Sequence, residues 1–251
     1  MAASLRPSVI NNEIVTMKKS LALLIAGFTV SLTAGDLTGT VTLKGTPPAE
    51  KEIGPLKDDA TCGKLAGAAT AKTTHYVVGA KGELANCIVI IKGVPGAKST
   101  GADAKPLVVD QKSCLYVPQI FAVQTGQKIS IKNSDPVMHN VHTTPKEDGG
   151  NKESNQAQMA GGPDLTVTID KPENFLRFKC EVHNWMFAYA CAVDHPYFAL
   201  TGPDGTFKIA NVPPGKYPVT ALHRKAAPTG VDQEVEIKAD GGKAEFTLEA
   251  K

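Results

Sequence analysis

The sequence lacks three features that would indicate other classes of protein. Helical periodicity is absent outside the N-terminal region, and no apolar run other than residues 21–32 is long enough to suggest a membrane segment. Net charge is also missing, with 27 basic against 25 acidic residues, and the two kinds are equal in number once residues 1–34 are removed. This balance excludes nucleic acid and other polyanions as the main partner, because such partners require an excess of positive charge.

The N-terminus has the pattern of an export signal. A basic pair at residues 18–19 precedes the apolar residues 21–32, and small residues follow at 33–35. The apolar run is too short to span a bilayer comfortably. We therefore predict a signal peptide in residues 1–34, starting at Met17, a periplasmic or otherwise exported protein, and no membrane span in the mature chain. The alternative is an N-terminal anchor helix.

What is present is the composition of strands joined by tight turns. The chain has 23 Gly and 17 Pro, and its Val, Ile and Thr residues recur in short runs. These runs alternate apolar and polar residues or are apolar throughout, and Gly or Pro bounds them. We expect an all-β protein, with residues 143–164 as a long polar loop. The clearest predicted strands are 37–43, 86–91, 128–132, 165–169 and 244–248.

Both ends of this strand pattern carry motifs of one known domain. Residues 39–45 at the front, and 204–209 and 211–217 at the back, resemble the carboxypeptidase regulatory-like, transthyretin-type β-sandwich. The front and back motifs lie far apart in the sequence, as an insertion would place them. The resemblance implies one discontinuous sandwich interrupted by a second domain, and no peptidase activity. The expected boundaries are 36–100 with 194–251 for the sandwich, and 105–193 for the insertion.

The inserted segment contains a set of soft and nitrogen donors. Cys180, His183 and Met186 lie within seven residues, and His139 stands upstream on a predicted strand of its own. Two His and one Cys in a plane, with Met as a weak axial ligand, form a mononuclear copper site for electron transfer. Because side chains alternate along a strand, Cys180 and His139 should point inward and His142 outward.

The same segment resembles the cupredoxins, most closely amicyanin and plastocyanin. The resemblance rests on the pattern from Val117 to Asn133, on His139-Asn-Val-His142, and on Cys180-x-x-His183-x-x-Met186. It implies a Greek-key β-sandwich that binds one copper ion. His139, Cys180 and His183 would then be equatorial ligands and Met186 the axial one. Asn140 would join the two ligand segments by hydrogen bonds, Trp185 would lie beside the site, and the exposed edge of His183 would pass the electron.

Other metals, and other roles for the nearby His and Gln residues, fit the sequence less well. Zinc could bind Cys and two His, but Met is a poor zinc ligand, and a binuclear copper centre would need a second Cys in the ligand loop. His142 is interpreted as a spare surface residue and His195 as a hydrogen-bonded structural residue. Gln119 could approach the metal, but a satisfied core amide is the preferred interpretation.

The cysteine count fits this assignment. Five Cys minus one metal ligand leaves four for two disulfides, which suits an oxidising compartment. Cys62 and Cys114 have polar neighbours, whereas Cys87 and Cys191 have apolar ones. Matching like with like predicts Cys62–Cys114 and Cys87–Cys191, although sequence cannot fix connectivity. The alternative for the second pair is two small buried thiols.

The residues therefore favour an exported blue copper protein that carries one electron at a time. Its partners would be redox proteins such as a cytochrome or a dehydrogenase, and it would be an electron carrier rather than an enzyme. An oxidase or nitrite reductase role is disfavoured, because it needs a second copper site with its own His cluster. Two alternatives remain: a copper-handling protein, and a structural or adhesive module with incidental copper.

Overall fold

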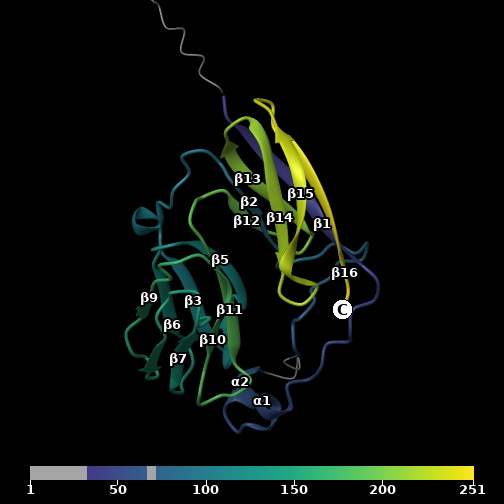
Figure 1. Cartoon of the computed structure of the whole chain (residues 1–251). Coiled ribbons are helices and arrows are strands. Elements are labelled where there is room, and N and C mark those ends of the chain that lie inside the picture. The colour runs from purple at the N-terminus through teal and green to yellow at the C-terminus, as the bar shows by residue number, and fades with distance from the viewer. Residues whose placement is uncertain (1–32, 67–71) are drawn as a thin grey trace, which may run out of the picture. The chain divides into compact units, whose positions relative to one another are not determined.

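Two pairs of β-sheets make up most of the regular structure of the computed structural model, which describes residues 33–66 and 72–251 (Figure 1). The predicted all-β fold is confirmed. Most of the predicted signal peptide, residues 1–34, lies outside the described residues. No helix in the described ranges is long and apolar enough to cross a membrane.

The first pair of sheets is built from strands near the two ends of the described chain. One sheet has the order β13-β1-β16, in which β1 runs antiparallel to β13 and parallel to β16. The other has the order β12-β2-β14-β15, antiparallel throughout. A common apolar cluster, with Val41, Ile91, Val219 and Phe246 among its members, draws on both sheets. The strands are β1 (Gly35–Lys44), β2 (Ile88–Ile91), β12 (Phe198–Leu200), β13 (Thr206–Val212), β14 (Gly215–His223), β15 (Ala227–Ile237) and β16 (Gly242–Glu249).

The second pair is built from the strands between β2 and β12 in sequence. One sheet has the order β5-β11-β10-β7-β8 and the other β4-β3-β6-β9. Their shared core includes Phe121, Ile131, Val141 and Phe178, so the pair forms a sandwich. The strands are β3 (Leu107–Lys112), β4 (Leu115–Val117), β5 (Ile120–Gln124), β6 (Ile129–Asn133), β7 (His139–Thr144), β8 (Ser154–Gln158), β9 (Leu165–Val167), β10 (Glu173–Lys179) and β11 (Phe187–Val193).

A smaller cluster joins the two sandwiches. Ile88 and Leu222 of the first pair pack with Ile120, Cys191 and Val193 of the second. The strand order is compatible with an interrupted sandwich, but it does not fix where one domain ends. The boundaries 36–100, 194–251 and 105–193 therefore stay a prediction.

Two segments differ from the expected loops. Residues 143–164 contain β8, a mostly polar strand that pairs with β7 at the edge of its sheet. The mixed, charged and Ala-rich sequence of residues 49–73 predicts a loop with at most one helical turn. This region instead contains two short helices, α1 (Gly54–Asp58) and α2 (Cys62–Ala66), and a 3-10 helix, η1 (Gly101–Asp103), precedes β3. Asp59 caps the turn that leads into α2, since its Oδ1 accepts the N–H groups of Thr61 at 2.9 Å and Cys62 at 2.7 Å.

Candidate metal centre

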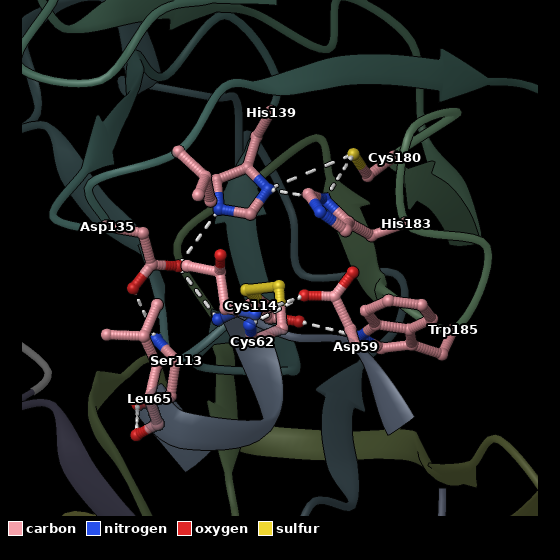
Figure 2. Close-up of a disulfide and its surroundings, with 12 residues drawn as sticks. Asp59, Cys62, Leu65, Ser113, Cys114, Asp135, His139, Cys180, His183 and Trp185 are labelled. Carbon is pink, nitrogen blue, oxygen red and sulfur yellow. Dashed lines mark hydrogen bonds and ion pairs between the residues drawn. A yellow bond between two sulfur atoms is a disulfide. The ribbon is translucent and has the colours of Figure 1, made fainter. Parts of the chain in front are cut away.

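His139 is held in one orientation by a buried carboxylate. It begins β7 and its side chain is fully buried, as the strand alternation predicted. Its Nε2 donates to Oδ2 of Asp135 at 2.9 Å, and because a carboxylate only accepts, Nε2 carries the proton. Nδ1 is then the ring atom left to bind a metal ion, and it faces Cys180 and His183 (Figure 2). A carboxylate that orients a histidine in this way is typical of metal sites.

Cys180 and His183 lie on a short loop between β10 and β11. The loop closes on itself, because Cys180 N–H donates to Met186 O at 3.1 Å and Met186 N–H donates to His183 O at 2.9 Å. Cys180 is 2% exposed and belongs to the core of the second sandwich. Met186 is fully buried in the same core. The position of its sulfur as an axial ligand stays a prediction.

The three equatorial candidates form a triangle of donor atoms. The Sγ of Cys180 lies 3.6 Å from Nδ1 of His183 and 4.0 Å from Nδ1 of His139, and the two Nδ1 atoms are 3.0 Å apart. Three N and S donors bonded to one central ion at about 2.0–2.3 Å would be roughly 3.5–4.0 Å apart. The sulfur–nitrogen distances fit that range, and the imidazoles lie somewhat closer together. The donor set thus fits a copper ion.

The pKa shifts at the triangle favour a thiolate. Burial raises the pKa of Cys180, but hydrogen bonds from His139 and from backbone N–H groups outweigh it and hold the pKa below its usual value. Burial and the charge of His139 lower the pKa of His183. For His139, burial lowers the pKa, but the hydrogen bonds to Asp135 and Cys180 prevail and raise it.

These shifts predict that copper affinity falls on acidification. Below its raised pKa, the imidazole of His139 carries a proton that an incoming ion must displace. Because the pKa of His139 is raised, the proton competes from a higher pH than for a free imidazole. We expect about a tenfold loss of apparent affinity per pH unit below that pKa, and a plateau above it. Competition with a chelator of known affinity checks this, and a flat profile between about pH 5 and 8 would contradict it.

Asn140 joins the two ligand segments, as predicted. Its backbone N–H donates to Sγ of Cys180 at 3.4 Å, and its side-chain Oδ1 accepts the N–H of Glu181 at 2.5 Å. The first bond stabilises negative charge on sulfur. The second holds the end of β10 beside the start of β7, so the cysteine and the first histidine keep their separation.

The expected exposed edge of His183 is not found. His183 is 7% exposed, and its ring centroid lies 5.2 Å from that of Trp185. Trp185 in turn donates from Nε1 to the carbonyl of Cys114 at 3.2 Å. Figure 2 shows the Cys62–Cys114 disulfide and α2 on this side of the site. The prediction failed because the covering segment comes from residues 53–66, far away in sequence.

The other candidates lie away from the triangle. His142 is not a spare surface residue: it is 8% exposed, with Nδ1 at 2.5 Å from Glu181 and Nε2 bonded to Glu153. These glutamates come from neighbouring segments and close over it. His195 accepts the N–H of Tyr197 at 3.2 Å, as a structural residue would. The amide of Gln119 is half-buried and bonded to Thr74, rather than to the site.

One predicted disulfide is confirmed and the other is wrong. Cys62 and Cys114 are bonded, with their Cα atoms 5.6 Å apart. Cys87 and Cys191 are free and buried. Cys87 packs within the first sandwich, whereas Cys191 lies in the cluster between the two, so the similar apolar settings of these residues do not bring them together. The alternative of two buried thiols holds, and burial raises the pKa of each to about 12.

Sequence reasoning missed Asp135. Burial raises the pKa of this carboxyl, but hydrogen bonds from His139, Cys114 and Ser113 hold it below its usual range. Its Oδ1 accepts the N–H of Ser113 at 2.7 Å, and Oδ2 that of Cys114 at 2.8 Å. An acidic residue in the turn four positions before His139 was the available signal, but nothing distinguished it from the other acidic residues.

Comparison with known families supports a copper-binding domain in this part of the chain. Residues 104–193 match a family model described as copper binding proteins, plastocyanin/azurin family. The matched segment includes all four predicted ligands, and it supports a cupredoxin-type domain there. No curated protein matches the chain. The first sandwich is not identified by these comparisons, so its carboxypeptidase regulatory-like assignment stays a prediction.

Solved structures of low identity are also similar. An oxidised amicyanin mutant is 17% identical, with a TM-score of 0.30, over 42% of this chain and 98% of that one. A purple cupredoxin from Nitrosopumilus maritimus is 14% identical, with a TM-score of 0.29, over 35% and 99%. A copper-containing nitrite reductase from Thermus scotoductus is 15% identical, with a TM-score of 0.32, over 36% of this chain. The match spans 23% of the length of that reductase.

The nitrite reductase corrects one expectation. We expected an electron carrier rather than an enzyme, and disfavoured a nitrite reductase role. A copper enzyme is nevertheless among the similar structures, although over a small part of its length.

Proposed function

We propose that this chain is an exported type 1 copper protein that transfers single electrons between redox proteins. The observation that carries the proposal is the triangle of Cys180 Sγ and the Nδ1 atoms of His139 and His183, with edges of 3.0, 3.6 and 4.0 Å. The donors come from two segments that only the fold brings together. The family match over residues 104–193 supports the same metal.

The residues around the site would let a copper ion change its charge with little movement of its ligands. Copper supplies a one-electron couple, for which thiolate suits Cu(I) and imidazole suits Cu(II). Asp135 fixes the ring of His139, and Asn140 fixes Cys180 relative to that ring. The apolar core around Cys180, including Phe178 and Met186, excludes water. Ligands held in this way need little rearrangement when the electron arrives or leaves.

Compartment and partner belong to the same proposal. The N-terminal pattern favours export to the periplasm, and the disulfide Cys62–Cys114 suits an oxidising compartment. A redox protein such as a cytochrome or a dehydrogenase would supply or accept the electron. In this proposal the copper domain spans residues 105–193, and residues 36–100 with 194–251 form a transthyretin-type sandwich around it.

The test is a spectrum of the copper-loaded, purified chain. We expect an intense visible absorption from the thiolate–copper bond, and a paramagnetic resonance spectrum of one mononuclear Cu(II). Reversible one-electron cycling at constant copper content should accompany them. A colourless copper-loaded protein would end the proposal. Release of copper on each reduction would instead favour the copper-handling alternative.

A further inference from the structure

A disulfide-linked segment covers the copper site on the side of His183. We call residues 53–66 the cap, because they contain α1 and α2 and lie against the ligand loop (Figure 2). The cap is attached to the second sandwich at Cys114 by the disulfide from Cys62, and by a hydrogen bond from Ser113 Oγ to Leu65 O at 3.2 Å. Three fully buried residues, Leu56, Cys62 and Cys114, form its apolar contact, against which Trp185 packs.

The contacts place the cap directly over one imidazole. A ring nitrogen of His183 and the two disulfide sulfurs all lie within 4.8 Å of one another. Cys114 serves as the junction: its sulfur holds the cap, its carbonyl accepts from Trp185, and its N–H donates to Asp135. The result is that His183 is 7% exposed, although its loop lies at the surface and the next residue back, Val182, is 50% exposed.

The cap depends on this attachment for its position. Each of its helices has five residues, which is too short to be stable alone. Its fully buried residues are few, and they pack on the disulfide itself. The disulfide joins positions 52 residues apart in sequence, so without it the chain entropy favours release of the cap.

We propose that the cap determines which reagents can exchange electrons with the copper, by keeping small molecules away from His183. The inference rests on the proposed electron-transfer function. Electron transfer weakens steeply with distance, so a layer of protein over the imidazole slows any reagent that cannot approach it closely. A small oxidant or reductant would then react slowly, and the disulfide sets that selectivity.

The first experiment measures access to His183 without relying on copper. The full chain, with and without copper, is treated with diethyl pyrocarbonate, and modification of each histidine is followed by mass spectrometry. In the unaltered protein we expect His183 to react much more slowly than the half-buried His75. In Cys62→Ala with Cys114→Ala, His183 should react about tenfold faster, because the cap opens more often. The control, Cys87→Ala with Cys191→Ala, removes two buried thiols elsewhere and should leave the rate unchanged.

The second experiment measures the rate of electron transfer from the copper to a small oxidant. The reduced, copper-loaded proteins are mixed with ferricyanide, and oxidation of the copper is timed. Loss of the disulfide should speed this oxidation about tenfold with the visible spectrum unchanged. Trp185→Phe removes the hydrogen bond to Cys114 and part of the packing on the cap but keeps the disulfide. It should raise both rates by less, and it tests the proposal if the double variant does not fold.

The outcomes separate this inference from the proposed function. Fast labelling of His183 in the unaltered protein, or equal labelling with and without the disulfide, would contradict the proposal that the cap shields His183. So would an oxidation rate that does not respond to any of these variants. A copper-loaded protein without the type 1 spectrum would overturn the proposed function, and the labelling would still decide whether the cap shields His183.

Discussion

Cys180→Ser should abolish the visible colour of the copper-loaded protein. The sulfur lies 3.6 and 4.0 Å from the two Nδ1 atoms and receives the N–H of Asn140, so it is the central soft donor of the site. An alkoxide is a harder and much more basic ligand than a thiolate, so Ser loses both the charge-transfer band and most of the affinity for Cu(I). Absorption and paramagnetic resonance spectra at equal copper loading measure the effect.

The chain offers a matched control for this variant. Cys87 is a buried thiol in the core of the first sandwich, away from the ligand loop. The Cys87→Ala protein should keep the full visible spectrum, although we expect its free energy of unfolding to be lower than that of the unaltered protein. If Cys180→Ser kept the intense band, the thiolate would not be a copper ligand and the whole assignment of the site would fail.

Asp135→Asn should lower copper affinity by about 10–100-fold, the usual range for a residue that orients a metal-binding histidine. The carboxylate accepts from three donors: Oδ1 from Ser113, and Oδ2 from Cys114 and His139. An amide has only one acceptor oxygen, so either the His139 side or the Ser113 side meets an NH₂ group. An unsatisfied buried donor also costs about 1–3 kcal/mol of the free energy of unfolding.

Three measurements on Asp135→Asn separate these effects. Chelator competition gives the affinity, denaturant unfolding of the metal-free chain gives the stability, and the pH profile of copper binding reports on His139. Because the carboxylate raises the pKa of His139, its loss should move the onset of the affinity loss to lower pH. Asp164→Asn changes an exposed carboxylate bonded to Ser130 and should leave all three unchanged. Unaltered affinity in Asp135→Asn would contradict an orienting role.

The sequence was enough to find the four candidate ligands, but not the residues that surround them. The spacing of Cys180, His183 and Met186 and the alternation around His139 are local patterns, and strand geometry predicted the inward direction of His139. The resemblance to the cupredoxins implied that Asn140 would hydrogen-bond to the other segment, but it did not name Glu181 as the partner. By contrast, residues 53–66 carry no apolar periodicity that would assign them a partner. These residues lie over His183 because of the Cys62–Cys114 disulfide. The sequence predicted that disulfide, but it could not show that the disulfide would place residues 53–66 beside the site.

The remaining errors have the same physical origin. Cys87 and Cys191 have equally apolar neighbours, yet they lie in separate clusters, because a local setting says nothing about distance in the fold. His142 faces away from the core as alternation requires, but Glu153, between β7 and β8, and Glu181, on the ligand loop, bond to its ring and bury it. Both cases depend on contacts between segments that are distant along the chain.

The pairing of β1 with β16 has a consequence for synthesis. Residues Leu37–Lys44 of β1 pair one by one with Gly242–Glu249 of β16. The first described strand therefore cannot complete its pairing until the last one has been made. The strands of the second sandwich are complete once the chain has emerged as far as Val193. The part with the predicted ligands can therefore form while β1 still has an open edge, and an edge left open for that long is exposed to pairing with other chains.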